Sequence, residues 1–298
     1  MSRRLREAIP SPLRAVVHRV REPASRLGYI RERWPRPLGT RPPIELAICA
    51  IFRDEARYLA EWVSFHRVQG VERFYLYDNR SSDDWQSALA PDIEAGIVAV
   101  QHWPFVPGQR SAYDHCLEQH RDEAHWIAFI DIDEFLFSPT GRQLPDVLRE
   151  FDTQPAVLVN WRIFGTNGFA RPPDGLVIEN YLERPADDFE GNRWMKSIVN
   201  PRRTVGARSA HHFKVRGEPV AEDHKPVHGI VVREPTADLL RINHYYAKSD
   251  EEFRKKAQRP VALTGELDAD REPPPPAVVR DETALQFADE VRNLLAAR

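Results

Sequence analysis

The stretch WIAFIDIDEFLFS, residues 126–138, decides the fold. Its first five residues are apolar and mostly bulky or β-branched, as in a strand that is covered on both faces. The strand then ends in three carboxylates, Asp131, Asp133 and Glu134. In an open α/β sheet ligands bind at the carboxyl edge of the strands. A divalent cation on Asp131 and Asp133 would neutralise the pair and clamp a diphosphate; the alternative is a solvated acidic turn.

Two upstream strands are expected to place polar residues at the same edge. Residues 44–52 (IELAICAIF) and 71–77 (VERFYLY) form strands separated by a helical pattern, and such a unit demands a parallel, right-handed crossover. Arg53 and Asp54 follow the first strand, and Asp78 follows the second, where an acidic residue suits a ribose or base edge. No Gly-rich loop follows the first strand, which disfavours a dinucleotide site or a P-loop.

Helices are expected between these strands, and a third strand is expected after them. Residues 53–55 are expected to begin the first helix, with acidic side chains in its first turn, and Gly70 ends it. A third strand over 97–102 and a helix over 109–121 lead into the opening stretch. The sequence therefore predicts an α/β domain with a parallel sheet.

Composition narrows the class of protein. The chain has 298 residues, 42% of them hydrophobic, and its net charge of -3 gives no argument for nucleic-acid binding. Cys49 and Cys116 are expected to be free thiols of a reducing compartment. No apolar run has the length of a membrane span, and the N-terminus lacks the apolar core of a secretory signal. We expect a cytoplasmic protein, or one peripheral to the inner face of the cytoplasmic membrane.

Three regions are expected. Residues 1–43 form an arm rich in Arg and Pro whose short helical pattern suits an anionic membrane surface; a flexible tail, or a helix packed on its own domain, is the alternative. Residues 44–258 form the α/β domain. Residues 259–298 form a Pro-rich linker and a helix over 284–297, which docks on the domain or on a second copy, so a homo-oligomer is possible.

The last third of the chain supplies further candidate site residues. A strand over 156–163 leads to Trp161 and Phe164, whose rings suit the apolar face of a sugar, although either ring can instead belong to the core. Lys196 offers a point charge to a phosphate oxygen. Among five histidines, His244 is the best metal ligand, because it follows the strand pattern LLRIN.

A helix is predicted to begin just after Lys248 and Ser249, with Asp250, Glu251 and Glu252 in its first turn. The start of a helix beside a lysine and a serine suits a phosphate group.

Long segments of the chain resemble a known family. They are FRDEARYLAEWVSFHRVQGVERFYLYDNRSSDD, PGQRSAYDHCLEQHRDEAHWIAFIDIDEFLF, WRIFGTNGF, KSIVNP and INHYYAKSDEEFRKK. In this order they resemble glycosyltransferase family 92 and its bacterial relatives in the family 2-like group, over most of residues 44–258. The resemblance implies a GT-A fold, with a Rossmann-like, mostly parallel sheet flanked by helices. It also implies a nucleotide-sugar donor and a divalent metal, commonly Mn²⁺, with Mg²⁺ as the second choice.

The resemblance also implies residue roles. Asp131 and Asp133 bind metal and diphosphate, joined by His244, while Arg53, Asp54 and Asp78 line the nucleotide pocket. The family often has Lys-Asn-Glu where this chain has residues 53–55, so the charge of the first position is kept and the role of the second is open.

The predicted reaction is metal-dependent transfer of a sugar, with inversion, to a hydroxyl of a glycan or glycolipid. The resemblance favours a UDP-sugar, UDP-galactose in particular. Glu134, Asp187 and Asp188 remain alternatives for the general base. Two other functions stay open: a metal-dependent nucleotide-sugar hydrolase or nucleotidyltransferase, and a non-catalytic protein that binds a membrane surface.

Overall fold

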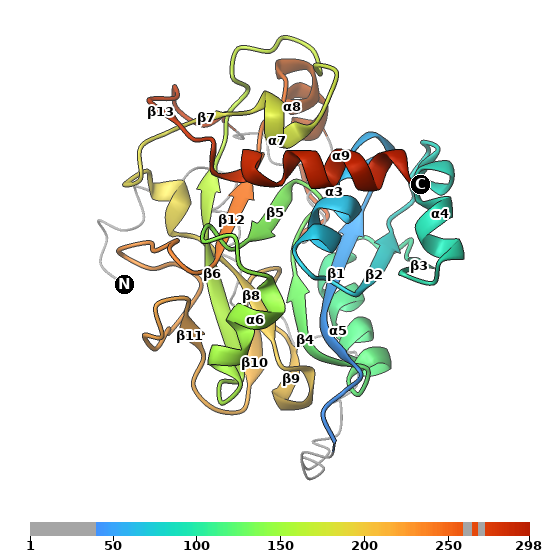
Figure 1. Cartoon of the computed structure of the whole chain (residues 1–298), viewed down its shortest axis with the longest axis vertical. Coiled ribbons are helices and arrows are strands. Elements are labelled where there is room, and N and C mark those ends of the chain that lie inside the picture. The colour runs from blue at the N-terminus through green and yellow to red at the C-terminus, as the bar shows by residue number, and fades with distance from the viewer. Residues whose placement is uncertain (1–39, 259–263, 268–271) are drawn as a thin grey trace.

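The computed structural model describes residues 40–258, 264–267 and 272–298 (Figure 1). Nearly all of the predicted arm and part of the predicted linker lie outside these residues. The first half of the domain alternates strands with helices: β1 (Ile44–Phe52), α3 (Ala56–Val68), β2 (Arg73–Asp78), α4 (Trp85–Glu94), β3 (Val98–His102), α5 (Gln109–His120) and β4 (Ala124–Phe129). These four strands pair in parallel, as predicted.

The second half has shorter elements and long connections. They are β5 (Glu134–Phe137), α6 (Leu144–Leu148), η1 (Arg149–Phe151), β6 (Ala156–Ile163), α7 (Val177–Asn180), β7 (Glu183–Arg184), η2 (Glu190–Arg193), β8 (Met195–Val199), η3 (Pro201–Arg203), β9 (Thr204–Ala207), β10 (Phe213–Val215), β11 (Val220–Ala221), β12 (Arg241–His244), α8 (Asp250–Ala257), β13 (Val279–Arg280), η4 (Thr283–Phe287) and α9 (Ala288–Ala296).

One mixed sheet organises the domain. In the described part of the chain it has nine strands, ordered β3-β2-β1-β4-β8-β6-β12-β5, with β11 beside β6. β8 runs antiparallel to both β4 and β6, and β12 is antiparallel to β5. The predicted parallel arrangement therefore holds for the first four strands, whereas the second half is mixed. The return from β6 to β8 contains only short helical turns, and parallel strands are usually joined by a crossover helix.

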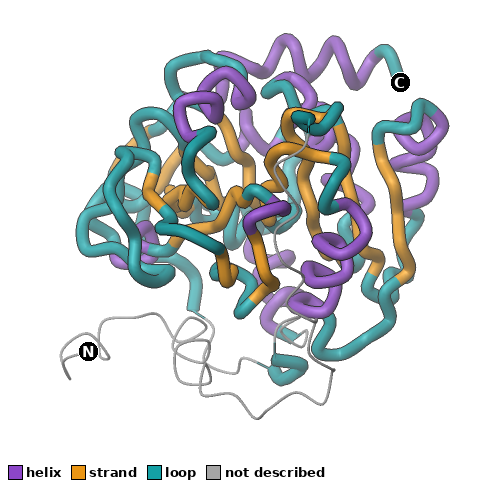
Figure 2. The backbone as a smooth tube through the Cα atoms, turned by 90° about the horizontal axis from the view of Figure 1, so that it is seen from below, coloured by secondary structure: helices purple, strands orange, loops and turns teal. Residues whose placement is uncertain are grey.

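Two apolar cores lie on the two faces of this sheet. Alternate residues of β1 supply them: Leu46, Ile48 and Ala50 belong to one core, and Ala47, Cys49 and Ile51 belong to the other. α3 packs into the first core and α5 into the second. Figure 2 shows helices on both sides of the strands. This double burial explains why residues 46–52 are all apolar.

The helix after β1 starts later than predicted. Asp54 has a φ of 53°, in the left-handed region that Asp tolerates better than most residues, so it belongs to a turn. α3 begins at Ala56, whose N–H donates to the Asp83 carboxylate at 2.7 Å, and its first turn contains no acidic residue. The predicted acidic first turn at residues 53–55 is therefore wrong.

The C-terminal segment docks on its own domain. The predicted helix over 284–297 consists of the 3-10 helix η4 and the α-helix α9. The Phe287 ring packs 5.8 Å from that of Phe65 and 5.7 Å from that of Phe137, and Val291 is fully buried. Figure 1 shows α9 lying across α3.

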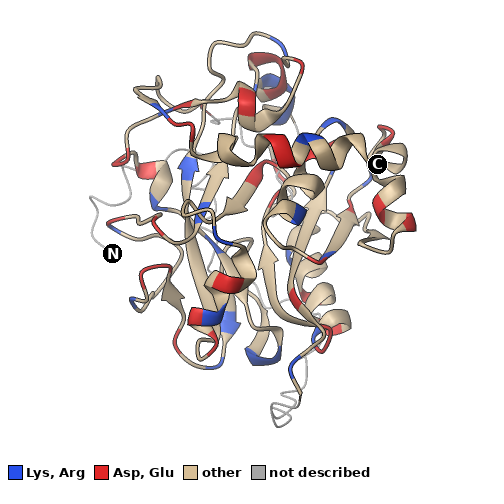
Figure 3. Ribbon diagram, in the orientation of Figure 1, with Lys and Arg blue, Asp and Glu red and all other residues tan. Residues whose placement is uncertain are grey.

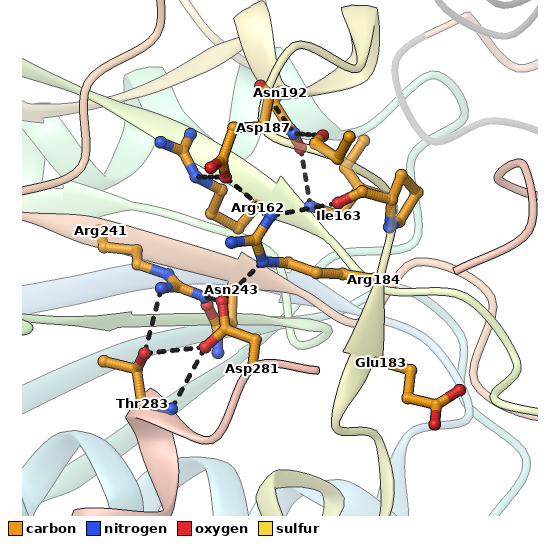
Figure 4. A network of polar contacts seen from close by, with 12 residues as sticks. Arg162, Ile163, Glu183, Arg184, Asp187, Asn192, Arg241, Asn243, Asp281 and Thr283 are labelled. Atoms are coloured by element: carbon orange, nitrogen blue, oxygen red, sulfur yellow. Dashed lines mark hydrogen bonds and ion pairs between the residues drawn. The ribbon is translucent and has the colours of Figure 1, made fainter. Parts of the chain in front are cut away.

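A buried carboxylate holds this segment to the sheet. Asp281 accepts hydrogen bonds from Arg184 of β7 and Arg241 of β12, and its other oxygen accepts one from the Thr283 hydroxyl (Figure 4). The side chains of both arginines and of Asp281 are less than a tenth exposed. Burial alone would raise the pKa of Asp281, but the two arginines outweigh it and hold that pKa well below its usual range.

Charged residues lie on helices, on loops and in several strands, whereas β4 has no Lys, Arg, Asp or Glu (Figure 3). In the described ranges, every helix is too short or too polar to cross a membrane.

Candidate active site

The carboxyl ends of β1, β2 and β3 bring together part of the predicted nucleotide pocket. Asp78 is buried, and its two oxygens accept from the Ser81 N–H at 2.9 Å and contact His102 Nδ1 at 3.0 Å. Asp54 accepts from both the N–H and the hydroxyl of Ser82, at 2.7 and 3.0 Å. Asp54 and Asp78 therefore fix one shared loop, residues 78–83, at this edge.

Arg53 precedes this loop. Its Nε lies 3.7 Å from the Asp54 carboxylate, and its side chain is 43% exposed at the same edge of the sheet. Phe52 lies opposite Asp78 in the β1–β2 pairing, which places Arg53 just beyond the last paired residues. A nucleotide contact by Arg53 stays a prediction.

Asp131 follows β4, the neighbour of β1 on its other side. Its Oδ2 accepts from Lys196 Nζ at 2.7 Å, and its Oδ1 accepts from Gln109 Nε2 at 2.8 Å. Lys196 comes from β8 and is almost completely buried. Burial disfavours its charge, but Asp131 and Glu134 outweigh burial and raise the pKa of Lys196. Asp131 is thus neutralised by a fixed lysine.

Glu134 supports the turn that carries Asp131. Its side chain is fully buried, and Oε2 accepts from the Asp131 N–H at 2.9 Å and lies 3.6 Å from Lys196 Nζ. Burial raises the pKa of Glu134 well above its usual range, and Lys196 acts in the opposite direction. This geometry favours the turn-capping alternative over a general base that meets an acceptor.

Asp133 and His244 face each other on the second half of the sheet. His244, at the end of β12, lies opposite Glu134 of β5, and its Nε2 is 3.5 Å from Asp133 Oδ2. The same Asp133 oxygen accepts from Lys256 of α8. Burial would raise the pKa of Asp133, but Lys256 and His244 outweigh it and hold the pKa well below its usual range. Burial lowers the pKa of His244, so its imidazole is neutral at pH 7.

Two of the three predicted metal ligands therefore lie together. A carboxylate and a neutral imidazole suit Mn²⁺, and Nε2 is the ring atom of His244 that faces Asp133. The other ring nitrogen, Nδ1, is buried, and the described residues provide no hydrogen-bond partner for it. Within the described ranges no group of three His, Cys, Asp or Glu side chains is arranged to hold a metal. Asp133 and His244 fit an ion that takes its remaining ligands from substrate phosphates and water, as Mg²⁺ does in many phosphate sites. The oxygens of Asp131 accept from Lys196 and Gln109, and the charge of Asp131 also acts on His244. A metal contact by Asp131 stays a prediction.

Lys248 lies beside the same pair. Its Nζ is 3.3 Å from Glu55 Oε2 and sits over the Tyr58 ring, 3.5 Å from the centroid. Burial raises the pKa of Glu55, while Lys248 lowers it and the charge of Asp133 raises it further. The charge of Asp133, in the turn after β4, therefore acts on Glu55, in the loop after β1. This links the two halves of the site.

Ser249 has a structural role at the start of α8. Its hydroxyl accepts from the Glu252 N–H, and the Glu252 carboxylate accepts from the Ser249 N–H in return, which makes a capping box. Ser249 is fully buried. A donor-phosphate contact by Ser249 stays a prediction, and its hydroxyl is already committed to the helix.

Ser249→Ala is expected to lower the free energy of unfolding by about 1 kcal/mol, because it removes the N-cap of α8. Urea denaturation of the variant and of the wild type measures the difference. The matched control is Ser87→Ala in α4, at an exposed position inside the helix, where the change should be close to zero. Equal effects of the two substitutions would contradict the capping role.

The two predicted acceptor contacts are buried. Phe164 is fully buried and packs 4.9 Å from Tyr245, which favours the core alternative left open for it. Trp161 is 3% exposed, and its ring lies 4.4 Å from that of His244. Trp161 therefore packs against the imidazole ring of His244.

The remaining candidates for the general base lie on the exposed loop after β7. Asp187 is 70% exposed and pairs with Arg184 at 2.8 Å and Arg162 at 3.5 Å (Figure 4). Side chains alternate along β6, so Arg162 points to the face opposite Trp161. Asp187 thus belongs to the network of the C-terminal segment. Asp188 is exposed.

Sequence reasoning missed Lys256, Gln109 and His102. Lys256 is one of three consecutive basic residues of α8, and nothing in that run distinguishes it from its neighbours. Gln109 and His102 stand at the ends of predicted elements on the site edge, which is the one signal that singles them out.

Comparison with known proteins assigns the family. Residues 43–264 match the family model described as glycosyltransferase family 92, and the chain therefore belongs to this family. A family 92 protein of Ricinus communis is 32% identical over 236 residues, which are 76% of this chain and 40% of the relative. One of Oryza sativa subsp. japonica is 30% identical over 223 residues, 73% and 36% of the two chains. The chain thus spans about two fifths of the length of these relatives.

Other similarities cover less of the chain or are lower in identity. A galactan β-1,4-galactosyltransferase of Arabidopsis thaliana is 30% identical over 110 residues, 32% of this chain and 21% of that protein. Among solved structures, TarS 1–349 of S. aureus shares 14% identity at a TM-score of 0.37 and covers 53% of this chain and 47% of its own. A mannosyltransferase of Pyrobaculum calidifontis, with GDP-Man and Mn²⁺, shares 17% at 0.34, over 51% and 44%. Structural likeness this low carries no argument.

Proposed function

We propose that this chain transfers a sugar from a nucleotide-diphosphate sugar to a hydroxyl of a glycan or glycolipid, using a GT-A fold and a divalent metal. The observation that carries the proposal is the pairing of Asp133 with His244 beside Lys248 and Lys256, at a sheet edge that also presents Asp54 and Asp78. In a member of glycosyltransferase family 92, these groups would bind the diphosphate and the nucleoside of the donor.

Negative charge develops on the departing diphosphate as the bond to the anomeric carbon breaks. A metal held by Asp133 and His244 supplies Lewis-acid stabilisation of that charge. Lys248 and Lys256 add positive charge from the protein. Lys196 holds Asp131 in place by a hydrogen bond, and Glu134 fixes the turn between the two aspartates. An acceptor hydroxyl attacks with inversion and needs a base within ~3 Å.

For the donor we propose UDP-galactose and for the metal Mn²⁺, with Mg²⁺ as the second choice. The similarity to a galactan galactosyltransferase over 110 residues supports galactose. The basic arm, outside the described residues, would bring the enzyme to an anionic membrane where glycolipid acceptors are made.

Thermal shift with UDP and GDP, each with and without Mn²⁺, tests the proposal. UDP with Mn²⁺ is expected to raise the melting temperature, since a ligand at about 100 times its dissociation constant adds about 2.7 kcal/mol of stability. UDP alone should give a smaller shift. The absence of a shift with any nucleotide would contradict the proposal, and hydrolysis of UDP-galactose without transfer would favour the hydrolase alternative.

A further inference from the structure

The helix α8 contacts Asp133 through Lys256. None of its eight residues is buried. Its start is fixed by the capping box, and the Asp250 and Glu251 N–H groups donate to the carbonyls of Phe169 and Ala170. In its last turn Lys256 donates to Asp133 and to the Tyr246 carbonyl, the latter at 3.0 Å, and lies 4.5 Å from the Tyr246 ring centroid.

Lys256 differs from the other two lysines of the site. The side chains of Lys196 and Lys248 are 1% and 8% exposed and are paired with Asp131 and Glu55. That of Lys256 is 33% exposed and is carried by a surface helix. Solvent reaches this ammonium group, so it can leave its carboxylate at a smaller desolvation cost than a buried lysine.

Lys256 and His244 contact the same oxygen of Asp133. Both contacts are to Oδ2. A cation bound between Asp133 and His244 would use this oxygen, and the ammonium group of Lys256 on the same oxygen would repel that cation. A diphosphate, in contrast, brings negative charge to which a displaced lysine can turn.

We propose that Lys256 makes metal binding depend on the donor: it holds Asp133 until a diphosphate arrives, and it then pairs with that diphosphate while the metal takes the carboxylate. The inference rests on the proposed function. Because coupling between two ligands is reciprocal, the lysine raises the affinity of the metal–nucleotide pair and lowers that of the metal alone.

Mn²⁺ binding to the full chain, followed by the electron paramagnetic resonance signal of free Mn²⁺ with and without UDP, tests this inference. Lys256→Met is expected to bind Mn²⁺ alone about tenfold more tightly, and the gain in Mn²⁺ affinity on adding UDP should shrink about tenfold. Lys256→Arg keeps the charge and should behave like the wild type. Lys255→Met is the matched control, because Lys255 pairs with Glu251, a residue of the same helix.

The outcomes separate the two proposals. If the wild type binds Mn²⁺ and UDP together and Lys256→Met gives the same two affinities, the role of Lys256 is refuted while the proposed function stands. If the wild type binds no nucleotide, both the role of Lys256 and the proposed function are refuted. A melting temperature of Lys256→Met close to that of Lys255→Met shows that the comparison concerns folded protein.

Discussion

Asp133→Asn is expected to lower the rate of sugar transfer about 10²- to 10³-fold, the usual cost of removing one group that stabilises charge in a transition state. The amide keeps the shape of the side chain but is a poor metal ligand, so the proposed metal would lose one ligand of the Asp133–His244 pair. Its effect on folding should be small, because the partly exposed Lys256 loses a partner that solvent can replace.

Initial rates with UDP-galactose and a glycan acceptor, at saturating Mn²⁺, measure this effect. Asp146→Asn is the matched control, since Asp146 forms an exposed pair with Arg149 at 2.6 Å on α6. A rate within about twofold of the wild type for Asp133→Asn, a difference below 0.5 kcal/mol, would remove Asp133 from the site.

Asp281→Asn is expected to lower the free energy of unfolding by about 3–5 kcal/mol, because it removes the one buried carboxylate that Arg184 and Arg241 share. Arg184 then keeps only the exposed Asp187 as a partner. Chemical denaturation at pH 7 measures the loss. Glu282→Gln is the matched control: Glu282 pairs with Arg280 and both side chains are more than half exposed, so the change should stay below about 1 kcal/mol.

The effect of Asp281→Asn depends on pH in a defined direction. The pKa of Asp281 is lowered in the folded protein, so its carboxylate stabilises the fold above the unfolded-state pKa of about 3.9 and loses this contribution as the pH falls toward the folded value. The difference between variant and wild type should therefore shrink below about pH 4. A difference that is constant from pH 7 to pH 3 would contradict the ion-pair account.

The sequence was sufficient to predict the strands that are buried on both faces of the sheet. β1 and β6 have the predicted bounds, because a strand covered on both sides is mostly apolar and β-branched, and β1 ends where the polar residues 53–55 begin. The same reasoning placed Asp54, Asp78 and Asp131 at the carboxyl ends of neighbouring strands. The sequence could not show whether β8 runs parallel or antiparallel to its neighbours, since all five of its residues are buried and burial carries no information about direction.

The types of residue at the candidate site could be predicted from the sequence, but the role of each residue could be predicted less well. Asp133 and His244 are brought together by the pairing of β5 with β12, which no local pattern encodes. Ser249 and Glu134 sit where predicted but serve the backbone, as a helix cap and a turn support. Sequence spacing shows that a polar side chain is near a ligand edge, whereas its hydrogen-bond partner, which decides its role, comes from a distant strand.

The insertion of β8 has a consequence for folding kinetics. β8 lies between β4 and β6, and the chain must reach residue 199 before the two halves of the sheet can join. The pairs that β8 makes with β4 connect residues about seventy positions apart, and such distant contacts slow folding because the loop must close before they form. The parallel half is expected to form first. The active site is then assembled only in the last stage, when β8 carries Lys196 beneath Asp131.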